Sequence, residues 1–259
     1  MNIDYVIHRN GEWTMLMLGE TVLSLLIIDL SDGFDYFVTF FSGVVSIILL
    51  EYLHFRSQPH DPNEHAIRRD KTAGVIFNVM MSIYSVSLVI LGTSYKMLLY
   101  ENVYAADGAD RRMLFPMVSR LLAGGESAAL RFDTEDRRQY IAHFFSGSMA
   151  LVFFSIDATA INHRGLVASM GRCECKDSHT TRYWVVFLVF IRVLLIGFIA
   201  TLSQYTTSPD TLAFVGLCGI LAQLVLRVLG SFAFPVDQEA EEDKLLERMA
   251  MHATARLRE

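Results

Sequence analysis

Long apolar runs, separated by shorter polar segments, alternate along this chain. Each run is close to the roughly 20 apolar residues that a helix needs to cross the hydrocarbon core of a bilayer. The pattern therefore predicts an all-α fold, a polytopic transmembrane helical bundle with about six spans. The predicted spans are residues 13–30, 34–53, 73–95, 140–161, 184–203 and 210–229.

The composition favours a membrane protein over a soluble one. Of the 259 residues, 53% are hydrophobic and 19% are charged, and the mean hydropathy is +0.35. A soluble domain carries about 25% charged residues and fewer long apolar runs. The expected partner is therefore the lipid bilayer. The sequence has no basic, aromatic surface of the kind that binds nucleic acid, and the net charge of −6 adds little about partners.

Lys and Arg occur after the second and fourth predicted spans and in the C-terminal tail, and are absent after the first and fifth spans. The long loop 96–139 carries seven Lys and Arg but also seven Asp and Glu, so it indicates its side of the membrane only weakly. Because Lys and Arg are enriched on the cytoplasmic side, this pattern predicts that both termini are cytoplasmic. The predicted transmembrane domain covers residues 1–234 and contains one long loop, 96–139. Within that loop, residues 115–125 predict a short helix on the membrane surface. Residues 235–259 are expected to form a charged helical tail in the cytoplasm.

Five charged residues inside predicted spans fall in the same half of the membrane, namely Glu20, Glu51, Asp157, Arg192 and Arg227. At 1.5 Å per residue, Glu20 lies about 10 Å, Arg192 about 12 Å and Asp157 about 6 Å from the cytoplasmic face. Charges at such depths usually face the protein interior and pair with each other. We expect Glu20 to pair with Arg192, and Asp157 is the second candidate partner of Arg192. Glu51 and Arg227 lie nearer the interface, where long side chains reach water, and need no special role.

The expected charge cluster has two interpretations that the sequence leaves open. An ion pair can simply hold helices together, whereas ionisable groups inside a membrane often handle protons or ions. The third span adds polar residues at helical spacing on one face, namely Asn78, Ser82 and Ser85. Such a stripe suits either the lining of a pathway or hydrogen bonds between helices.

Two segments carry residues of the kinds that bind metals. They are His54, His60 and His65 near the second span, and Cys173, Cys175 and His179 after the fourth. The histidines do not have the i, i+4 spacing of a zinc-binding helix, and one residue separates the cysteines instead of the usual two to four. We therefore expect ordinary polar loops, with no metal and no cofactor.

One resemblance to a known family stands out. The stretch HRNGEWTMLMLGETVLSLLI, residues 8–27, resembles the signature of the low temperature requirement A family of multi-pass membrane proteins, in which an arginine and an apolar stretch precede Leu-Gly-Glu. Further segments resemble its eukaryotic branch, in the order LHFRSQPH, HAIRRDKTAG, ILGTSYKMLLYE, LLAGGESAALRFDTEDRRQYIAHFF and NHRG. The resemblance extends over roughly residues 7–164.

The resemblance implies a multi-pass membrane protein in which Arg9, Gly19 and Glu20 matter. Gly19 would let a neighbouring helix approach the carboxylate closely. Family members tend to be longer on the N-terminal side, which gives the hypothesis that this chain is a C-terminal fragment of a longer member. Preceding helices, or a second copy in a homo-oligomer, would then complete the bundle.

Transport is the function that the sequence favours. A transporter or channel for an ion, a proton or a small solute would use the charged cluster and the polar stripe, and no catalytic constellation competes with it. The alternative is a structural or stress-adaptation membrane protein without transport. A membrane-bound, metal-dependent enzyme is the least favoured class.

Overall fold

The computed structural model describes residues 3–28, 33–58, 65–69, 71–107, 134–163 and 178–233. Within these residues every regular element is helical, which confirms the predicted all-α class. The elements are α1 (Ile3–Leu26), α2 (Phe34–Ser57), α3 (Ala66–Arg69), α4 (Lys71–Asp107), α6 (Thr134–Asn162), α8 (Ser178–Thr201), the 3₁₀ helix η2 (Leu202–Gln204) and α9 (Pro209–Ala233). The predicted surface helix at 115–125 and the tail at 235–259 lie outside the described residues.

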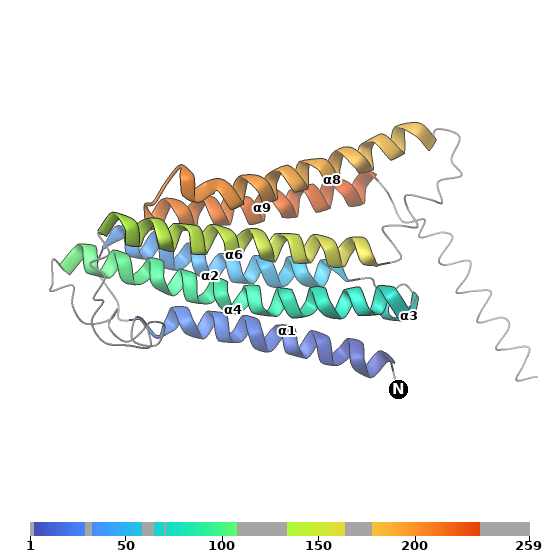
Figure 1. Ribbon diagram of the computed structural model, residues 1–259, viewed down its shortest axis with the longest axis horizontal. Helices are drawn as coiled ribbons and strands as arrows, with labels where there is room; N and C mark the ends of the chain where they lie inside the picture. The colour runs from blue at the N-terminus through green and yellow to red at the C-terminus, as the bar shows by residue number, and fades with distance from the viewer. Residues whose placement is uncertain are drawn as a thin grey trace, which may run out of the picture.

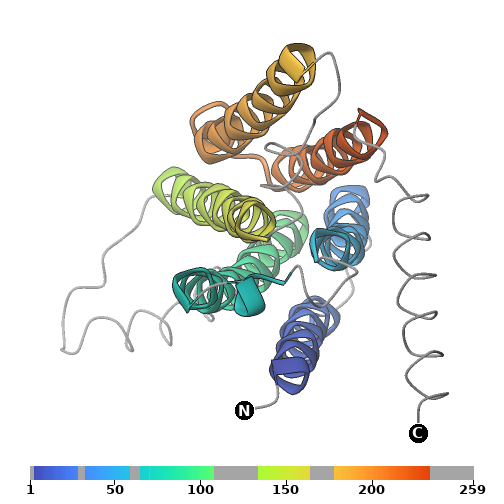
Figure 2. The same cartoon turned by 90° about the vertical axis from the view of Figure 1, so that its right-hand side faces the viewer.

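The long helices lie side by side in one bundle, and successive helices run in opposite directions (Figure 1). In the end-on view, α2 and α4 occupy the middle, α1 covers them on one side, α6 and α9 cover the other, and α8 is outermost (Figure 2). We call the end where α1 begins and α2 ends the proximal end. The end where α1 ends and α2 begins is the distal end.

Five of the described helices are long and apolar enough to cross a membrane, and the chain is an integral membrane protein. The qualifying segments are Phe34–Ser57, Lys71–Val103, Glu135–Asn162, Val186–Gln204 and Pro209–Leu229. They match the second to sixth predicted spans. The predicted first span falls in α1, which is not among them. Arg9, Glu12 and Glu20 dilute the apolar character of α1.

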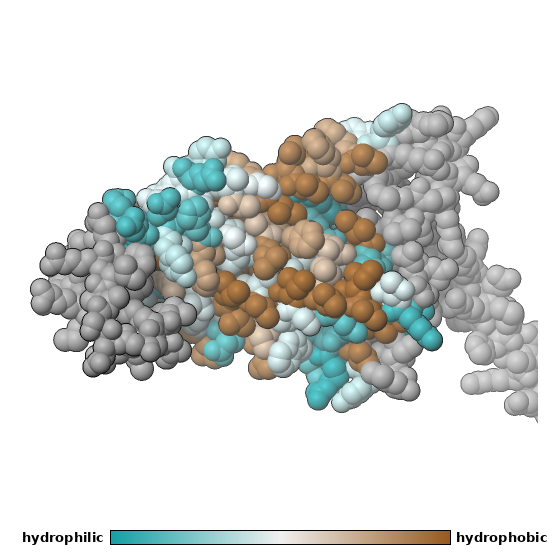
Figure 3. All heavy atoms as spheres, in the orientation of Figure 1, coloured by the Kyte–Doolittle hydropathy of each residue, from teal (hydrophilic) through white to brown (hydrophobic). Residues whose placement is uncertain are grey.

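Apolar side chains form much of the outer surface of the bundle. On the face shown in Figure 3, hydrophobic residues gather across the middle, and hydrophilic residues lie mostly toward the two ends. The clearest case is α8, where only 17% of the apolar stretch is buried inside the protein. In water such a surface would be strongly unfavourable. It is the surface expected of helices that contact lipid.

The helices extend beyond the apolar runs that predicted them. The loop predicted at 96–139 is wrong at both of its ends, because α4 continues to Asp107 and α6 already begins at Thr134. Leu98 and Leu99 are completely buried in this extension of α4. An apolar count ends where charged residues begin, whereas a helix continues as long as it finds packing partners.

Charged residues in the terminal turns of α2 and α6 have the signs that stabilise a helix end. Helix α2 has Asp35 in its first turn and Arg56 in its last turn, and α6 has Glu135 in its first turn. These positions complement the helix dipole. Pro209 begins α9, where its missing N–H costs nothing.

Contacts between α1 and α4 illustrate how the bundle is held together. The Trp13 Nε1–H donates a hydrogen bond to Ser85 Oγ at 3.0 Å, and Thr21 Oγ1 donates to the Leu88 carbonyl at 3.3 Å. A Cβ added to Gly92 would lie 2.9 Å from Thr21 Cγ2, so only glycine permits this approach. Gly19, which was expected to allow such an approach, has no neighbour within 4 Å of an added Cβ.

Candidate functional site

The most unusual feature of the interior is a carboxylate shared by two arginines. Asp157 is buried on α6 in the proximal half of the bundle. Arg227 of α9 approaches its Oδ1 with Nη2 at 3.1 Å, and Arg192 of α8 approaches the same oxygen with Nη1 at 3.6 Å. Gln223, one turn before Arg227 on α9, donates from Nε2 to Asp157 Oδ2 at 3.3 Å.

Arg227 also connects this site to the backbone of two helices. Its Nη1 donates to the carbonyl of Leu53 in α2 at 3.4 Å, and its Nη2 donates to the carbonyl of Ile156 in α6 at 3.4 Å. The site therefore joins α2, α6, α8 and α9. A guanidinium can do this because it carries five N–H donors in a fixed plane.

The charges of this site do not balance. One carboxylate and two guanidiniums leave one positive charge in the interior. Among the described residues, Asp157 is the one carboxylate that forms an ion pair with either arginine. Both arginines stay protonated, because guanidinium is effectively always charged in proteins. Since isolated charges are strongly disfavoured inside a membrane, this excess is the property that sets the site apart.

Several polar atoms at and near the site lack hydrogen-bond partners. They are Nε of Arg192, Nε of Arg227, Oε1 of Gln223 and the hydroxyl of Tyr84. Tyr84 stacks on His54, with ring centroids 4.9 Å apart and an angle of 8° between the planes. Buried polar groups in native proteins are usually satisfied by protein, water or an ion. A group of orphaned atoms therefore indicates where a small polar species can bind.

A pair of buried histidines, His65 and His163, lies beyond the Asp157 site, toward the proximal end. The rings of His65 and His163 lie 4.7 Å apart, and both rings pack against Phe77. His163 Nδ1 accepts a hydrogen bond from the Ala66 N–H at 3.2 Å. Burial lowers the pKa of His65 to about 4. Burial, together with the neighbouring His65 and His54, lowers the pKa of His163 to about 3. Both rings are therefore neutral at pH 7.

The structure changes the predicted pairing of the charges. Arg192 pairs with Asp157, its second candidate partner, and not with Glu20. Glu20 is exposed on α1, at the opposite side of the bundle from α8, so the predicted Glu20–Arg192 pair is wrong. Depth alone suggested that pair, and residues at equal depth can still lie on distant helices.

The role expected for Arg227 is also wrong. It was placed near the interface without a special function, but its side chain is only 7% exposed and it binds Asp157. Together with Gln223 it is a residue that the sequence reasoning missed. The available signal was their spacing, because residues four apart lie on the same face of a helix. Glu51 is half-buried on α2.

The polar stripe on the third span is divided between surface and interior. Ser85 is buried and accepts the hydrogen bond from Trp13, which is the interhelical use of such residues. Asn78 and Ser82 are exposed, and Ser82 Oγ donates to the Asn78 carbonyl of its own helix. None of the three contacts the Asp157 site through a hydrogen bond.

The other family-signature residue, Arg9, lies near the exposed start of α1. It forms an ion pair with Glu12, with Arg9 Nη1 and Glu12 Oε2 2.9 Å apart. Both side chains are largely exposed, so such a pair contributes little to stability.

The described part of the chain holds no group of three or more His, Cys, Asp or Glu residues placed to bind a metal. His54 stacks on Tyr84, and His65 packs against His163 and Phe77. The candidates His60, Cys173 and Cys175, and the side chain of His179, lie outside the described residues.

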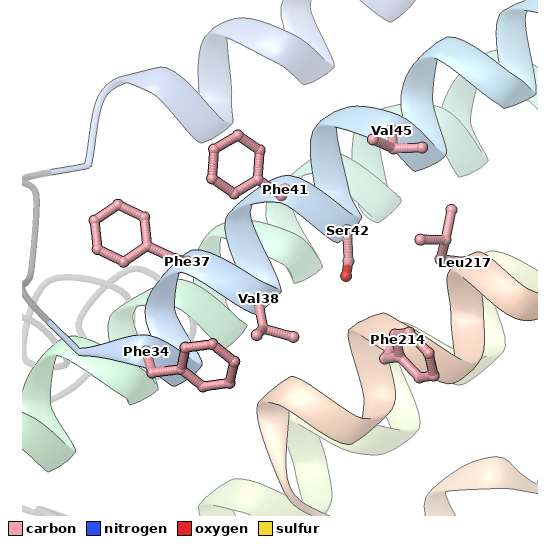
Figure 4. A pocket seen from close by; sticks show the side chains of 8 residues that line it. All are labelled: Phe34, Phe37, Val38, Phe41, Ser42, Val45, Phe214 and Leu217. Atoms are coloured by element: carbon pink, nitrogen blue, oxygen red, sulfur yellow. The ribbon is translucent and has the colours of Figure 1, made fainter.

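A groove of about 470 Å³ opens at the distal end, between the start of α2 and the start of α9. Figure 4 shows its apolar lining, which consists of Phe34, Phe37, Val38, Phe41, Ser42, Val45, Phe214 and Leu217. The groove contains no charged residue. It is therefore a surface suited to apolar chains and not to ions.

Comparisons of this chain with protein-family models, with curated proteins and with solved structures give no match.

Proposed function

We propose that this membrane protein moves an ion across the bilayer and that the ion is handled at the Asp157 site. The observation that carries this proposal is the carboxylate shared by Arg192 and Arg227 within the membrane-spanning part of the bundle. Ionisable groups inside transmembrane segments are costly and usually mark substrate or ion pathways. This proposal moves the expected transport residue from Glu20 to Asp157.

The surroundings of Asp157 support the proposal. The site draws residues from three helices, α6, α8 and α9, which are joined to one another mainly through side chains. Small shifts between these helices would make or break the contacts of Arg192, whose distance to Asp157 is already long at 3.6 Å. A site that changes its contacts when helices move is what alternating access requires. The resemblance to the low temperature requirement A family agrees with a multi-pass membrane protein. It does not indicate which ion is moved.

A structural function is the second candidate, and one observation favours it. Arg227 binds the backbone carbonyls of Leu53 and Ile156 as well as Asp157, so it also fastens α9 to α2 and α6. In that case the protein would carry no flux, and the network would serve only to hold the helices in register.

Ion flux through reconstituted protein separates the two candidates. Purified wild type, Asp157→Asn and Glu20→Gln would be placed in liposomes, and proton, potassium and chloride flux would be followed with fluorescent indicators. Glu20→Gln is the matched control, because it also neutralises a carboxylate but at an exposed position. Circular dichroism and gel filtration would show that each variant folds.

We expect wild type and Glu20→Gln to carry the same flux and Asp157→Asn to lose most of it. If Asp157→Asn fails to fold, Arg192→Lys provides the test, since it keeps the charge but removes the planar guanidinium. Wild-type flux no greater than that of empty liposomes would contradict transport and favour the structural function.

A further inference from the structure

The donors that Asp157 leaves unpaired all belong to cationic or neutral groups. Arg192 and Arg227 each keep a buried Nε–H without a partner, and the nearby Tyr84 hydroxyl is also free of hydrogen bonds. Arg227 is more than nine-tenths buried, so water does not reach its guanidinium freely. Unsatisfied N–H donors on positively charged groups are ligands for an anion and repel a cation.

The charge balance points to the same class of ligand. Arg192 and Arg227 both contact Oδ1 of Asp157, so the two guanidiniums lie close together and share a single negative charge. His54, whose ring lies near Arg227, is either neutral or positive and adds no negative charge. Glu51 lies near Tyr84 but forms no ion pair with either arginine in the described structure. One bound monovalent anion would bring the site to neutrality, which is the state that a low-dielectric interior favours.

We infer that the Asp157 site binds a small monovalent anion, held by the guanidinium edges of Arg192 and Arg227 that Asp157 leaves open. This inference rests on the proposed function and names the class of ion. The anion must be small, because the guanidiniums lie among packed helices and the groove of about 470 Å³ is at the distal end. Chloride and formate are small monovalent anions of this class.

The role of Asp157 follows from this arrangement. It holds the two arginines together when the anion is absent and lowers the affinity of the site for the anion. A site without this carboxylate would hold two positive charges and would release an anion slowly. Binding that is strong enough for entry and weak enough for exit is what conduction and transport need.

Thermal unfolding of the purified protein in detergent tests the inference. The melting temperature would be measured as sodium gluconate is replaced by sodium chloride at constant ionic strength, with chloride as the probe. Gluconate is a much larger anion than chloride, and a saturable response to chloride distinguishes specific binding from the general effect of the salt on stability. A ligand that binds the folded state stabilises it in a saturable way. At chloride concentrations about 100 times the dissociation constant, we expect a rise of about 5 °C.

Two variants decide whether the effect arises at this site. Arg192→Gln should abolish the dependence on chloride, whereas Arg9→Gln, which removes an exposed arginine, should leave it unchanged. If Arg192→Gln does not fold, Arg192→Lys is expected to weaken chloride binding at least severalfold. An equal melting temperature in the two salts for wild type, or an equal chloride effect in wild type and the Arg192 variant, would overturn the inference.

This experiment measures binding and therefore separates the inference from the proposed function. Chloride-dependent stability with no flux of any ion in liposomes would support the anion site and overturn transport. Proton or potassium flux that needs Asp157, together with identical stability in chloride and gluconate, would support transport and overturn the anion site.

Discussion

Two carboxylates in this bundle each pair with two arginines, but they lie at opposite ends of the helices. At the distal end, Glu101 of α4 pairs with Arg137 and Arg138 in the first turns of α6. In the proximal half, Asp157 pairs with Arg192 and Arg227. The chemistry of the two clusters is the same, and their surroundings are different.

Both carboxylates are buried, and access to water differs at one arginine of each cluster. The side chain of Arg138 is 38% exposed, whereas that of Arg227 is 7% exposed. The distal arginines are neighbours in sequence on one helix, and the proximal arginines come from two helices. At the distal cluster, water and counterions reach Arg138, so the charge on that arginine costs little. At the proximal cluster only other protein groups or a bound ion can compensate it.

Among the substitutions considered, loss of the proximal carboxylate should lower the free energy of unfolding most. Asp157→Asn leaves two buried arginines without a counter-charge, and breaking a buried pair in this way costs about 3–5 kcal/mol. The measurement is the free energy of unfolding in detergent with gluconate as the anion. A cost below about 1 kcal/mol, the range of exposed ion pairs, would show that the two clusters do not differ.

The proximal end should also be sensitive to acid. Because burial lowers the pKa of His65 and His163 from 6.5, the unfolded chain takes up protons below pH 6.5 while the folded protein does not. Their contribution to stability is complete above pH 6.5 and is lost as the pH falls toward 4. Because solvent screens part of both shifts, we expect the two histidines together to cost about 1 kcal/mol per pH unit at most.

Melting temperatures between pH 7 and pH 5 test this prediction. His65→Gln should reduce the slope with pH, and His8→Gln, a change at an exposed histidine, should not. A slope that is the same in wild type and His65→Gln would contradict it.

Loss of the distal carboxylate should have a smaller effect than loss of Asp157. Glu101→Gln removes two ion pairs, but water can solvate Arg138, so we expect a cost of about 1–2 kcal/mol. High salt should reduce this cost, because exposed charges are screened. Equal costs for Glu101→Gln and Asp157→Asn would remove the distinction between the clusters.

The smallest effect is expected at Glu20. Glu20→Gln changes an exposed side chain with no ion pair in the described structure, so the free energy of unfolding should change by less than about 0.5 kcal/mol. A double-mutant cycle with Arg192→Gln should give a coupling energy near zero. A coupling above about 1 kcal/mol would show that the two residues meet after all.

The positions of the helices along the chain could be predicted well from the sequence. Which helices lie side by side, and which charged side chains pair, could not. The second to sixth spans follow from runs of apolar residues, because bilayer thickness fixes the length of such a run. The pairing of Arg192 depends on which helices are neighbours. Alternation along the chain gives the depth of a residue but not the angle at which its helix faces the others, and for this reason the sequence favoured Glu20 over Asp157 as the partner of Arg192.

The sequence by itself determined the class of this protein: an all-helical chain whose apolar runs place it in a membrane, with charged residues inside several of the predicted spans. Only the tertiary structure decided which of those charges meet. Arg227 shows the physical reason, because its position near the end of α9 is compatible with either water or the interior. The packing of α2, α6 and α8 around it removed the water and left Asp157 as its partner.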